Sequence, residues 1–187
     1  MQRIPEPELM TTQEQVDAYA DADFSSGDSR TVALVEQLLD ETGPLPKDPL
    51  IVDLGCGPGN ITIRLAELLP NAQVIGIDGS EPMLAVAKQR SIRTSNNLKF
   101  IRLQLHDIEV ELKDLADLVV SNSLLHHLKK PDLLWSVTQS IAKPGCRVLH
   151  RDLRRPTSLA EVHRLQQQHL PKAPSVLIQD FTASLVA

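Results

Sequence analysis

Aromatic residues are scarce in this sequence, which has one Trp, one Tyr and three Phe among 187 residues, and its formal net charge is −5. Grooves that bind nucleic acid use a basic field and aromatic rings on which the bases stack. The composition therefore argues against a nucleic-acid partner, although a local basic patch would escape this count.

Cysteines and long apolar runs are also in short supply. Cys56 and Cys146 are the only cysteines, and they form neither a metal-ligand nor a disulfide pattern. We expect two reduced thiols in a cytoplasmic protein and predict no metal site.

No apolar run approaches the roughly 18 residues that cross a bilayer. The N-terminus MQRIPEPELM has no apolar segment like that of a signal peptide, so we expect no membrane partner.

Glycine is the third scarce residue, yet three of the eight glycines lie close together in IVDLGCGPGN, at Gly55, Gly57 and Gly59. A glycine inside a strand or helix costs roughly 0.5–1 kcal/mol relative to alanine. The cluster therefore indicates a backbone that turns tightly or approaches a ligand closely. A strand-to-helix turn without a ligand is the alternative, but one turn does not need three alternating glycines.

The N-terminal part reads as helical. Thr11 and Glu14 have the spacing of a capping box and predict a short helix through Ala20, and a second helix is expected after Asp28. The segment TGPLPKDP then breaks the helical pattern with one glycine and three prolines. We therefore divide the chain into an N-terminal helical cap, residues 1–46, and an α/β domain, residues 47–187.

The second part alternates strand and helix patterns. Strands are predicted at residues 50–54, 73–77, 98–103, 118–120 and 147–153, and helices at about 59–70, from 80, at about 134–144 and from 158. This alternation predicts a doubly wound, mainly parallel sheet with helices on both faces. Ligands of such sheets bind beyond the carboxyl ends of the strands, where the strand order reverses.

The glycine spacing narrows the choice of ligand. A dinucleotide fingerprint would place its third glycine at position 60, where the sequence has Asn60. Asp78 ends the second strand and lies near the separation of about 20 residues at which a carboxylate can bind ribose hydroxyls. A capping or solvated aspartate is the alternative interpretation of Asp78.

Several segments together resemble the class I S-adenosylmethionine-dependent methyltransferases, over roughly residues 30–155. Asp53-Leu-Gly-Cys-Gly-Pro-Gly59 matches their first motif, and Val74 to Ser80 with Pro82-Met83-Leu84 matches the segment after it. His106-Asp107-Ile108, Ala116 to Leu128 and Lys143-Pro-Gly-Cys146 resemble the later motifs. The resemblance implies a Rossmann-like fold. The family's sheet usually ends with two further strands, one of them antiparallel, and we expect this chain to lack both.

The resemblance also implies S-adenosylmethionine as cofactor and a role for each matching residue. The implied cofactor contacts are Gly55, Gly57 and Gly59 along the methionine part, Asp53 at the loop or the amino group, Asp78 with Gly79 at the ribose, Met83 on the adenine, Asp107 and Ile108 at the adenine edge, and Ser121 and Asn122 at the sulfonium. A core methionine is nearly as good an interpretation of Met83. Tyr19 could lie over the site or belong to the core.

The implied reaction is methyl transfer to an acceptor that the sequence does not name. SNSLL in the fourth-strand motif lacks the Asn-Pro-Pro-aromatic and Pro-Cys patterns of nucleic-acid and amide methylation, which favours a small-molecule acceptor. His126 and His127 are base candidates if the acceptor must lose a proton, and otherwise are packing or surface residues. Two alternatives remain: a non-catalytic cofactor-binding or interaction protein, and a dinucleotide enzyme with an atypical loop.

A basic cluster at the end of the fifth predicted strand bears on the acceptor. Arg151, Arg154 and Arg155 fall in HRDLRRP, and an arginine fork binds carboxylate or phosphate in two places. One of Arg154 and Arg155 could therefore orient an anionic acceptor. A solvated basic turn paired with Asp152 or Glu161 is the alternative.

Overall fold

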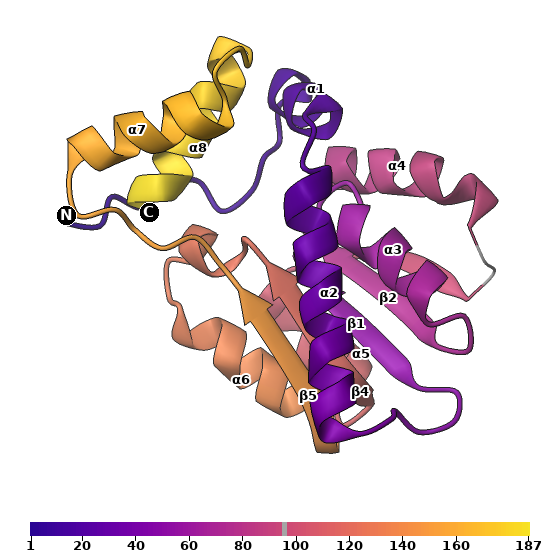
Figure 1. The fold of residues 1–187 in the computed structure, drawn as a ribbon. Helices are drawn as coiled ribbons and strands as arrows, with labels where there is room; N and C mark the ends of the chain where they lie inside the picture. Colours follow the sequence, from indigo (N-terminus) through magenta and orange to yellow (C-terminus); the bar gives the residue numbers. More distant parts are fainter. Residues whose placement is uncertain (95–96) are drawn as a thin grey trace.

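Five parallel strands form the single sheet of the computed structural model, which describes residues 1–94 and 97–187 (Figure 1). The strand order is β3-β2-β1-β4-β5, and every neighbouring pair is parallel. The strands are β1 (Leu50–Leu54), β2 (Gln73–Asp78), β3 (Leu98–Arg102), β4 (Ala116–Asn122) and β5 (Ala142–Arg151).

Helices connect the strands and cover both faces of the sheet (Figure 1). The α-helices are α1 (Gln13–Asp21), α2 (Ser25–Thr42), α3 (Asn60–Leu68), α4 (Glu81–Arg90), α5 (Ile108–Leu112), α6 (Asp132–Ile141), α7 (Leu159–His169) and α8 (Ser175–Val186). Short 3-10 turns lie at η1 (Ser91–Arg93), η2 (Leu105–Asp107) and η3 (Leu125–His127).

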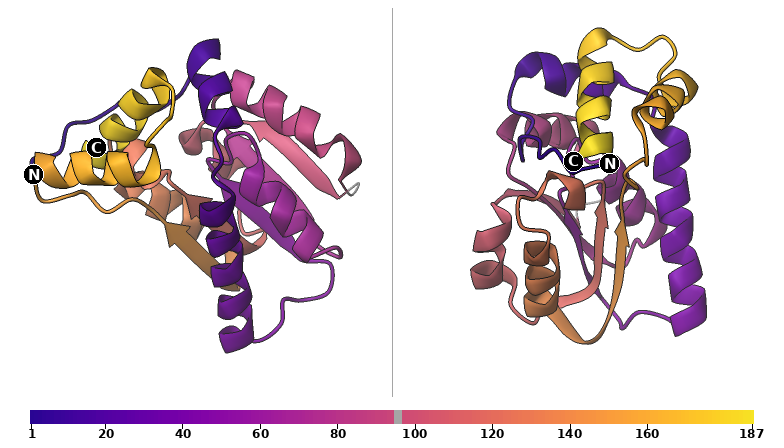
Figure 2. Two further views of the ribbon diagram at one scale, coloured as in Figure 1. Left: turned by 45° about the horizontal axis from the view of Figure 1, so that its top comes forward. Right: turned by 90° about the vertical axis from the view of Figure 1, so that its left-hand side faces the viewer.

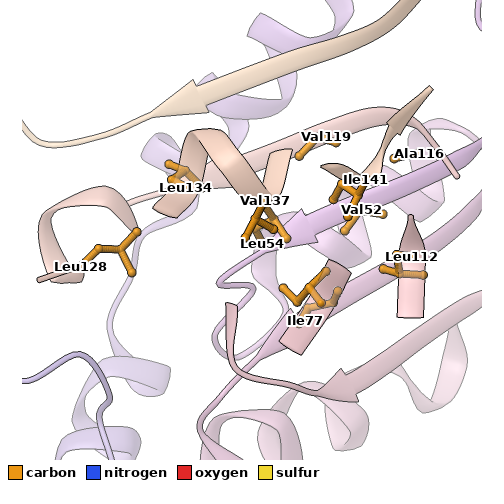
Figure 3. Packing of buried hydrophobic residues seen from close by; sticks show 11 residues of the cluster. Val52, Leu54, Ile77, Leu112, Ala116, Val119, Leu128, Leu134, Val137 and Ile141 are labelled. Carbon is orange, nitrogen blue, oxygen red and sulfur yellow. The ribbon is translucent and has the colours of Figure 1, made fainter. Parts of the chain in front are cut away.

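The hydrophobic core has one layer on each face of the sheet. Val52, Leu54 and Val119 point to one face and pack with residues of α5 and α6 such as Leu134 (Figure 3). The opposite face packs against α2 and α3 through Ile51, Val74, Leu118, Val120, Val35 and Leu65. Because both faces are covered, the central strands are apolar almost throughout, as in other parallel sheets.

The strand order creates a switch point beside β1. From β1 the chain moves outward through β2 to β3, then returns to the other side of β1 to add β4 and β5. Connections that leave β1 in opposite directions open a crevice at the carboxyl ends of the strands. The glycine loop follows β1 at this crevice.

Two segments from opposite ends of the chain, the N-terminal residues with α1 and the C-terminal helices α7 and α8, lie together above the carboxyl edge of the sheet (Figure 2). Helix α1 packs against α4 and α8, and α7 packs against α8. We call residues 1–12 the N-terminal strap. Its Ile4 N–H donates to the Val186 carbonyl at 2.9 Å, and its Arg3 guanidinium donates to the carbonyls of His126 and Leu128 at 3.1 and 2.6 Å.

The N-terminal helices begin at other residues than the sequence predicts. The side chain of Thr12, not Thr11, caps α1 by accepting from the Gln15 N–H at 3.3 Å. Helix α2 begins at Ser25, before Asp28, because the Asp23 carboxylate accepts the Ser25 N–H. We keep the domain boundary after residue 46 as a proposal. Helix α1 packs on α4 and α8, and α2 packs on α3 and β5 as part of the covered face of the sheet.

The C-terminal part differs more from the prediction. Strand β5 begins at Ala142 and passes through Pro144 and Gly145, where the sequence predicts the end of a helix. Its pairing with β4 is irregular between Ala116 and Leu118, and such a bulge accommodates proline and glycine within a strand. Ser158 caps α7 as predicted, but α8 was not predicted. The described residues contain the five parallel strands and no antiparallel one, as the sequence predicts.

Candidate functional site

A cavity of about 940 Å³ lies at the carboxyl ends of the strands. Its wall includes the loops after β1, β2, β3 and β4, together with residues of the N-terminal strap, α1, α7 and α8. Of the predicted site residues, the cavity wall includes Asp53, Gly55, Gly57, Asp78, Gly79, Met83, Asn122, His126 and His127. Gly59, Asp107, Ile108 and Ser121 lie outside it.

The three glycines of the loop after β1 have different surroundings. All three have positive φ angles, of 69°, 51° and 81°, which residues with a side chain rarely adopt. A Cβ on Gly57 would meet no atom within 4 Å, so this backbone faces open space in the cavity wall. A Cβ on Gly59 would lie 2.9 Å from Phe100 Cζ. Gly59 is therefore required by packing against β3, whereas Gly57 borders the cavity.

Asp53 is a buried carboxylate at the end of β1. Its Oδ2 accepts a 2.6 Å hydrogen bond from Thr62 Oγ1 on α3, which ties the strand to the helix across the glycine loop. Burial raises the pKa of Asp53 to about 7, the Thr62 bond opposes this, and Asp78 and Asp28 add to it. Asp53 thus ties the two sides of the loop together through Thr62.

Asp78 ends β2 and closes the other side of the loop. Its Oδ2 accepts the Gly57 N–H at 2.9 Å and its Oδ1 accepts the Ser80 N–H at 2.7 Å. Burial raises the pKa of Asp78, and the backbone N–H groups of Ser80, Gly57 and Gly79 partly offset this. A carboxylate has about four lone-pair positions, so Asp78 can accept further hydrogen bonds from a ligand.

Tyr19 lies in the cavity wall and packs against Phe24, with the ring centroids 4.8 Å apart and the planes tilted by 40°. Burial raises the pKa of Tyr19 to about 12, and the carboxylates of Asp28 and Asp78 add to the shift. Asp28 is itself buried and accepts from Asn60 Nδ2 at 3.1 Å. The phenol therefore stays protonated and can donate a hydrogen bond into the cavity.

The end of β4 carries a polar network that binds Arg151. Asn122 Oδ1 accepts from Thr31 Oγ1 at 3.0 Å and from Arg151 Nη1 at 3.1 Å. Arg151 also donates to Thr31 Oγ1 at 2.9 Å, so it links β5 to α2. Ser121 is buried and contacts His150 Nδ1 at 2.7 Å, which places its side chain in β4–β5 packing.

The other two arginines of the basic cluster, Arg154 and Arg155, differ in the groups that they contact. Both line the cavity. Arg155 donates to the Ala187 carbonyl, which fastens the segment after β5 to the end of α8. Arg154 is exposed, and its interaction with the Glu161 carboxylate is coulombic.

The histidines of η3 meet carboxylates from two distant segments. His126 is buried; its Nδ1 hydrogen-bonds to Asp152 Oδ1 and its Nε2 lies 3.5 Å from Glu6 Oε1. His127 Nδ1 lies 3.2 Å from the same Glu6 oxygen. Burial, together with His126, lowers the pKa of His127 to about 4, so this ring is neutral near pH 7. Burial opposes a lowered pKa at Asp152, but the His126 ring and the Leu153 and Leu125 N–H groups outweigh it.

The residues predicted at the adenine edge lie away from the cavity. Ile108 is fully buried in the core layer of α5 and α6, and Asp107 is exposed beside His106, with a 3.5 Å separation between carboxylate and ring. Gln104, Leu105 and His106 line the cavity instead. The chain turns at η2, so the cavity wall contains the first residue of the matched motif, His106, and the two residues before it, but not Asp107 or Ile108.

Sequence reasoning missed the N-terminal strap and the carboxylates that it brings. Glu6, Leu9 and Met10 lie in a segment without a periodic pattern, so no sequence signal places Leu9 and Met10 in the cavity wall or Glu6 beside His126 and His127. Asp152 does have a signal, because it lies within HRDLRRP, but that signal predicts a partner for the arginines. In the structure it accepts from His126 and from the Leu125 N–H.

No helix in the described ranges is both long and apolar enough to cross a membrane.

The chain matches the family model for a methyltransferase domain over residues 47–181. It is similar to the trans-aconitate 2-methyltransferase of Variovorax paradoxus, with 39% identity over 104 residues, covering 54% of this chain and 38% of that protein.

Two further likenesses point the same way. The malonyl-[acyl-carrier protein] O-methyltransferase of Bacillus cytotoxicus is 42% identical over 79 residues, covering 42% of this chain and 26% of that protein. The chain thus spans about a quarter to two fifths of the length of these two relatives. A solved structure from Methanococcus maripaludis, described as a candidate S-adenosyl-L-methionine-dependent methyltransferase, superimposes with a TM-score of 0.68, covering 90% of this chain and 76% of that one at 16% identity. The chain therefore belongs to the methyltransferase-domain family and has the Rossmann-like fold of class I S-adenosylmethionine-dependent methyltransferases.

Proposed function

We propose that this protein binds S-adenosylmethionine in the cavity and transfers its methyl group to a small-molecule acceptor. The observation that carries the proposal is the pairing of Asp78 with the Gly57 backbone at the switch point of the sheet. There a glycine loop and a carboxylate from the next strand face one cavity, which is the arrangement that binds a ribose and the chain attached to it.

The residues present fit this cofactor. Gly57 leaves open space beside its backbone, and Asp78 keeps lone pairs for two ribose hydroxyls beyond the two N–H groups that it accepts. Met83 and Leu105 offer apolar surface in the cavity wall for an adenine ring. Asp53 stands under the loop and can receive a cationic amino group. We thus keep Met83 as an adenine contact, as the sequence predicts, and propose Leu105 in place of Asp107 and Ile108.

The protein's own part is to position the reactants and exclude water. S-adenosylmethionine, when bound, supplies an electrophilic methyl group, so the protein need not generate one. The strap, α1, α7 and α8 supply the outer wall of the cavity, opposite the strand ends. Holding two reactants in line can lower a barrier by about 7–11 kcal/mol, which is the contribution that we assign to this wall and to Asn122 beside it.

We further propose that the acceptor is a carboxylic acid. Both curated relatives described above are named for carboxylate-bearing acceptors, trans-aconitate and a malonyl group. In this chain Arg154 lines the cavity and is exposed, whereas Arg151 is held by Asn122 and Thr31 and Arg155 by the Ala187 carbonyl. A guanidinium binds a carboxylate in two places, so Arg154 is the residue that we assign to the acceptor.

A carboxylate acceptor changes what is required of the histidines. A carboxylic acid in water ionises with a pKa of about 4, so such an acceptor carries no proton at neutral pH and needs no general base. His126 and His127, the base candidates suggested by the sequence, are then free for another role.

Calorimetry with S-adenosylhomocysteine, S-adenosylmethionine and NAD tests the cofactor. We expect the two S-adenosyl compounds to bind and NAD to fail. Asp78→Ala should weaken binding roughly 10- to 150-fold, the equivalent of about 1.5–3 kcal/mol for hydrogen bonds to a charged group. Asp107→Ala is the matched control and should bind like the wild type, because its carboxylate is exposed and outside the cavity wall. Unchanged affinity in a folded Asp78→Ala protein would refute the site.

Turnover tests the acceptor. S-adenosylhomocysteine release should be seen with a panel of di- and tricarboxylic acids and should be absent with the corresponding amides. Arg154→Gln should raise the KM for the best acid about tenfold or more and leave cofactor affinity alone. Arg164→Gln on α7, outside the cavity wall, should keep wild-type kinetics. Cofactor binding without turnover of any acceptor would favour the non-catalytic alternative.

A further inference from the structure

Glu6, His126 and His127 bring three metal-ligating side chains to one point beside the cavity. One ligand atom from each lies within 4.8 Å of the other two. We propose that they bind a divalent cation of the zinc class, through Glu6 Oε1, His126 Nε2 and His127 Nδ1. Glu6 comes from the N-terminal strap and the histidines from η3, so the ion would join segments more than a hundred residues apart.

The two distances from Glu6 Oε1 to the histidine nitrogens fit a tetrahedral centre. Zinc bonds of about 2.0–2.1 Å to nitrogen and oxygen place neighbouring ligand atoms roughly 3.3 Å apart. Glu6 Oε1 lies 3.5 Å from His126 Nε2 and 3.2 Å from His127 Nδ1. Two histidines and one carboxylate leave a fourth position, and because both histidines line the cavity, water or an oxygen ligand from the cavity can fill it.

The hydrogen bonding around Glu6 points to a missing cation. The Glu6 side chain is only 7% exposed. Within residues 1–94 and 97–187, no group hydrogen-bonds to its Oε1 or to His127 Nδ1, although both atoms are buried. The other oxygen, Oε2, accepts from Ser184 Oγ at 3.3 Å. A buried carboxylate oxygen without a donor is costly, and a cation between it and the two rings would satisfy it.

Asp152 prepares His126 for this role. The Asp152 carboxylate accepts a hydrogen bond from Nδ1 of His126. In a neutral ring the proton therefore lies on Nδ1, and the lone pair of Nε2 faces Glu6. Two acceptors then face each other unless a positive charge lies between them. A carboxylate on the far nitrogen of a metal-ligating histidine is a common arrangement that fixes the ring and raises its basicity. Asp152 is therefore a positioning residue.

The charge around the site also favours a cation. Glu6 and Asp152 contact the histidines directly, and Asp180 and Glu8 lie close enough to act on Glu6 and His127 electrostatically. Arg3 is a cation at the same turn, but its guanidinium is bonded to the carbonyls of His126 and Leu128. Four carboxylates against one guanidinium leave room for two positive charges.

Metal counting on the full chain tests the proposal. The protein is stripped with a chelator, incubated with Zn²⁺ and dialysed, and the bound zinc is measured. Affinity is measured by competition with a chromophoric chelator, and Co²⁺ substitution reports tetrahedral coordination by its visible spectrum. We expect one Zn²⁺ per chain. Glu6→Gln and His127→Gln should each weaken binding at least tenfold, and Asp152→Asn by roughly 10- to 100-fold.

Two controls separate this site from other metal binding. Glu14→Gln changes an exposed carboxylate on α1, and His163→Gln changes an exposed histidine on α7; both should bind zinc like the wild type. Circular dichroism checks that each variant folds. Absence of retained zinc in the wild type would overturn the proposal, as would unchanged retention in both Glu6→Gln and His127→Gln. Cofactor binding, measured separately on zinc-free protein, keeps this outcome distinct from that of the proposed function.

Discussion

At the scale of single residues, Asp53 is a buried carboxylate, and its removal from water raises its pKa. Its folded pKa of about 7 exceeds the unfolded value near 3.8, so between these values the folded state holds a proton that the unfolded state has lost. Stability must then fall as pH rises from about 4 to 7. Asp53→Asn removes the charge, and its stability relative to the wild type should grow over this window by about 2–4 kcal/mol.

Urea unfolding at pH 4 and at pH 8 measures this difference. Asp28, Asp78 and Glu6 also have raised pKa values, so the wild type alone cannot isolate Asp53, and the comparison must be with the variant. Asp107→Asn, at an exposed carboxylate, should follow the wild-type profile. A constant difference between Asp53→Asn and the wild type across the range would contradict the assignment.

At the scale of elements, the loop between β1 and α3 combines two uses of glycine. Gly59→Ala places a methyl group against Phe100 and Ala87 at positive φ, so we expect a loss of about 2–5 kcal/mol of stability from strain and overpacking. Gly57→Ala meets no neighbour, so its cost should be only about 1–2 kcal/mol of backbone strain. Its methyl group borders the cavity, however, and should weaken S-adenosylhomocysteine binding.

Thermal unfolding and calorimetry on both variants separate these effects. Phe100→Leu in the Gly59→Ala background should restore part of the lost stability, because it removes the ring atom that the new methyl group meets. Equal destabilisation by the two single changes, or no recovery in the double variant, would argue against this division of roles.

At the scale of the whole molecule, the strap and α8 hold the outer wall of the cavity over the sheet. Arg3 makes three of the contacts, to the carbonyls of His126, Leu128 and Ala187. A ligand that binds only the folded state stabilises it by about 2.7 kcal/mol at 100 times its Kd. S-adenosylhomocysteine should therefore slow hydrogen exchange in residues 1–12 and in α8, because both contribute to the wall of its cavity.

Arg3→Gln should speed exchange in the strap and reduce this protection. Exchange in β1 and β4, which are buried on both faces, should not change and serves as the internal reference. Unaltered strap exchange in Arg3→Gln would mean that other contacts, such as the Ile4–Val186 bond, hold the strap in place.

The sequence by itself determined the parallel sheet and the edge at which a ligand is expected, the carboxyl ends of the strands. Alternating strand and helix periods predict a parallel sheet, and the spacing from Gly55 to Asp78 predicts which strand ends meet, because parallel strands end at one edge. These are local signals, read within one or two elements. They also predict the end of β2 and the start of α4 at Ser80, which caps the helix as expected.

Only the tertiary structure decided which residues reach the cavity and what closes it. The η2 turn moves Asp107 and Ile108 out of the wall, and packing rather than a ligand explains Gly59. The strap has no periodic pattern, and its position depends on bonds across more than a hundred residues, such as Arg3 to Leu128. Such contacts have no local sequence signature, because the two partners lie far apart in the sequence and no periodic pattern in either segment identifies the other. The meeting of Glu6 with His126 and His127 was therefore not predictable from spacing.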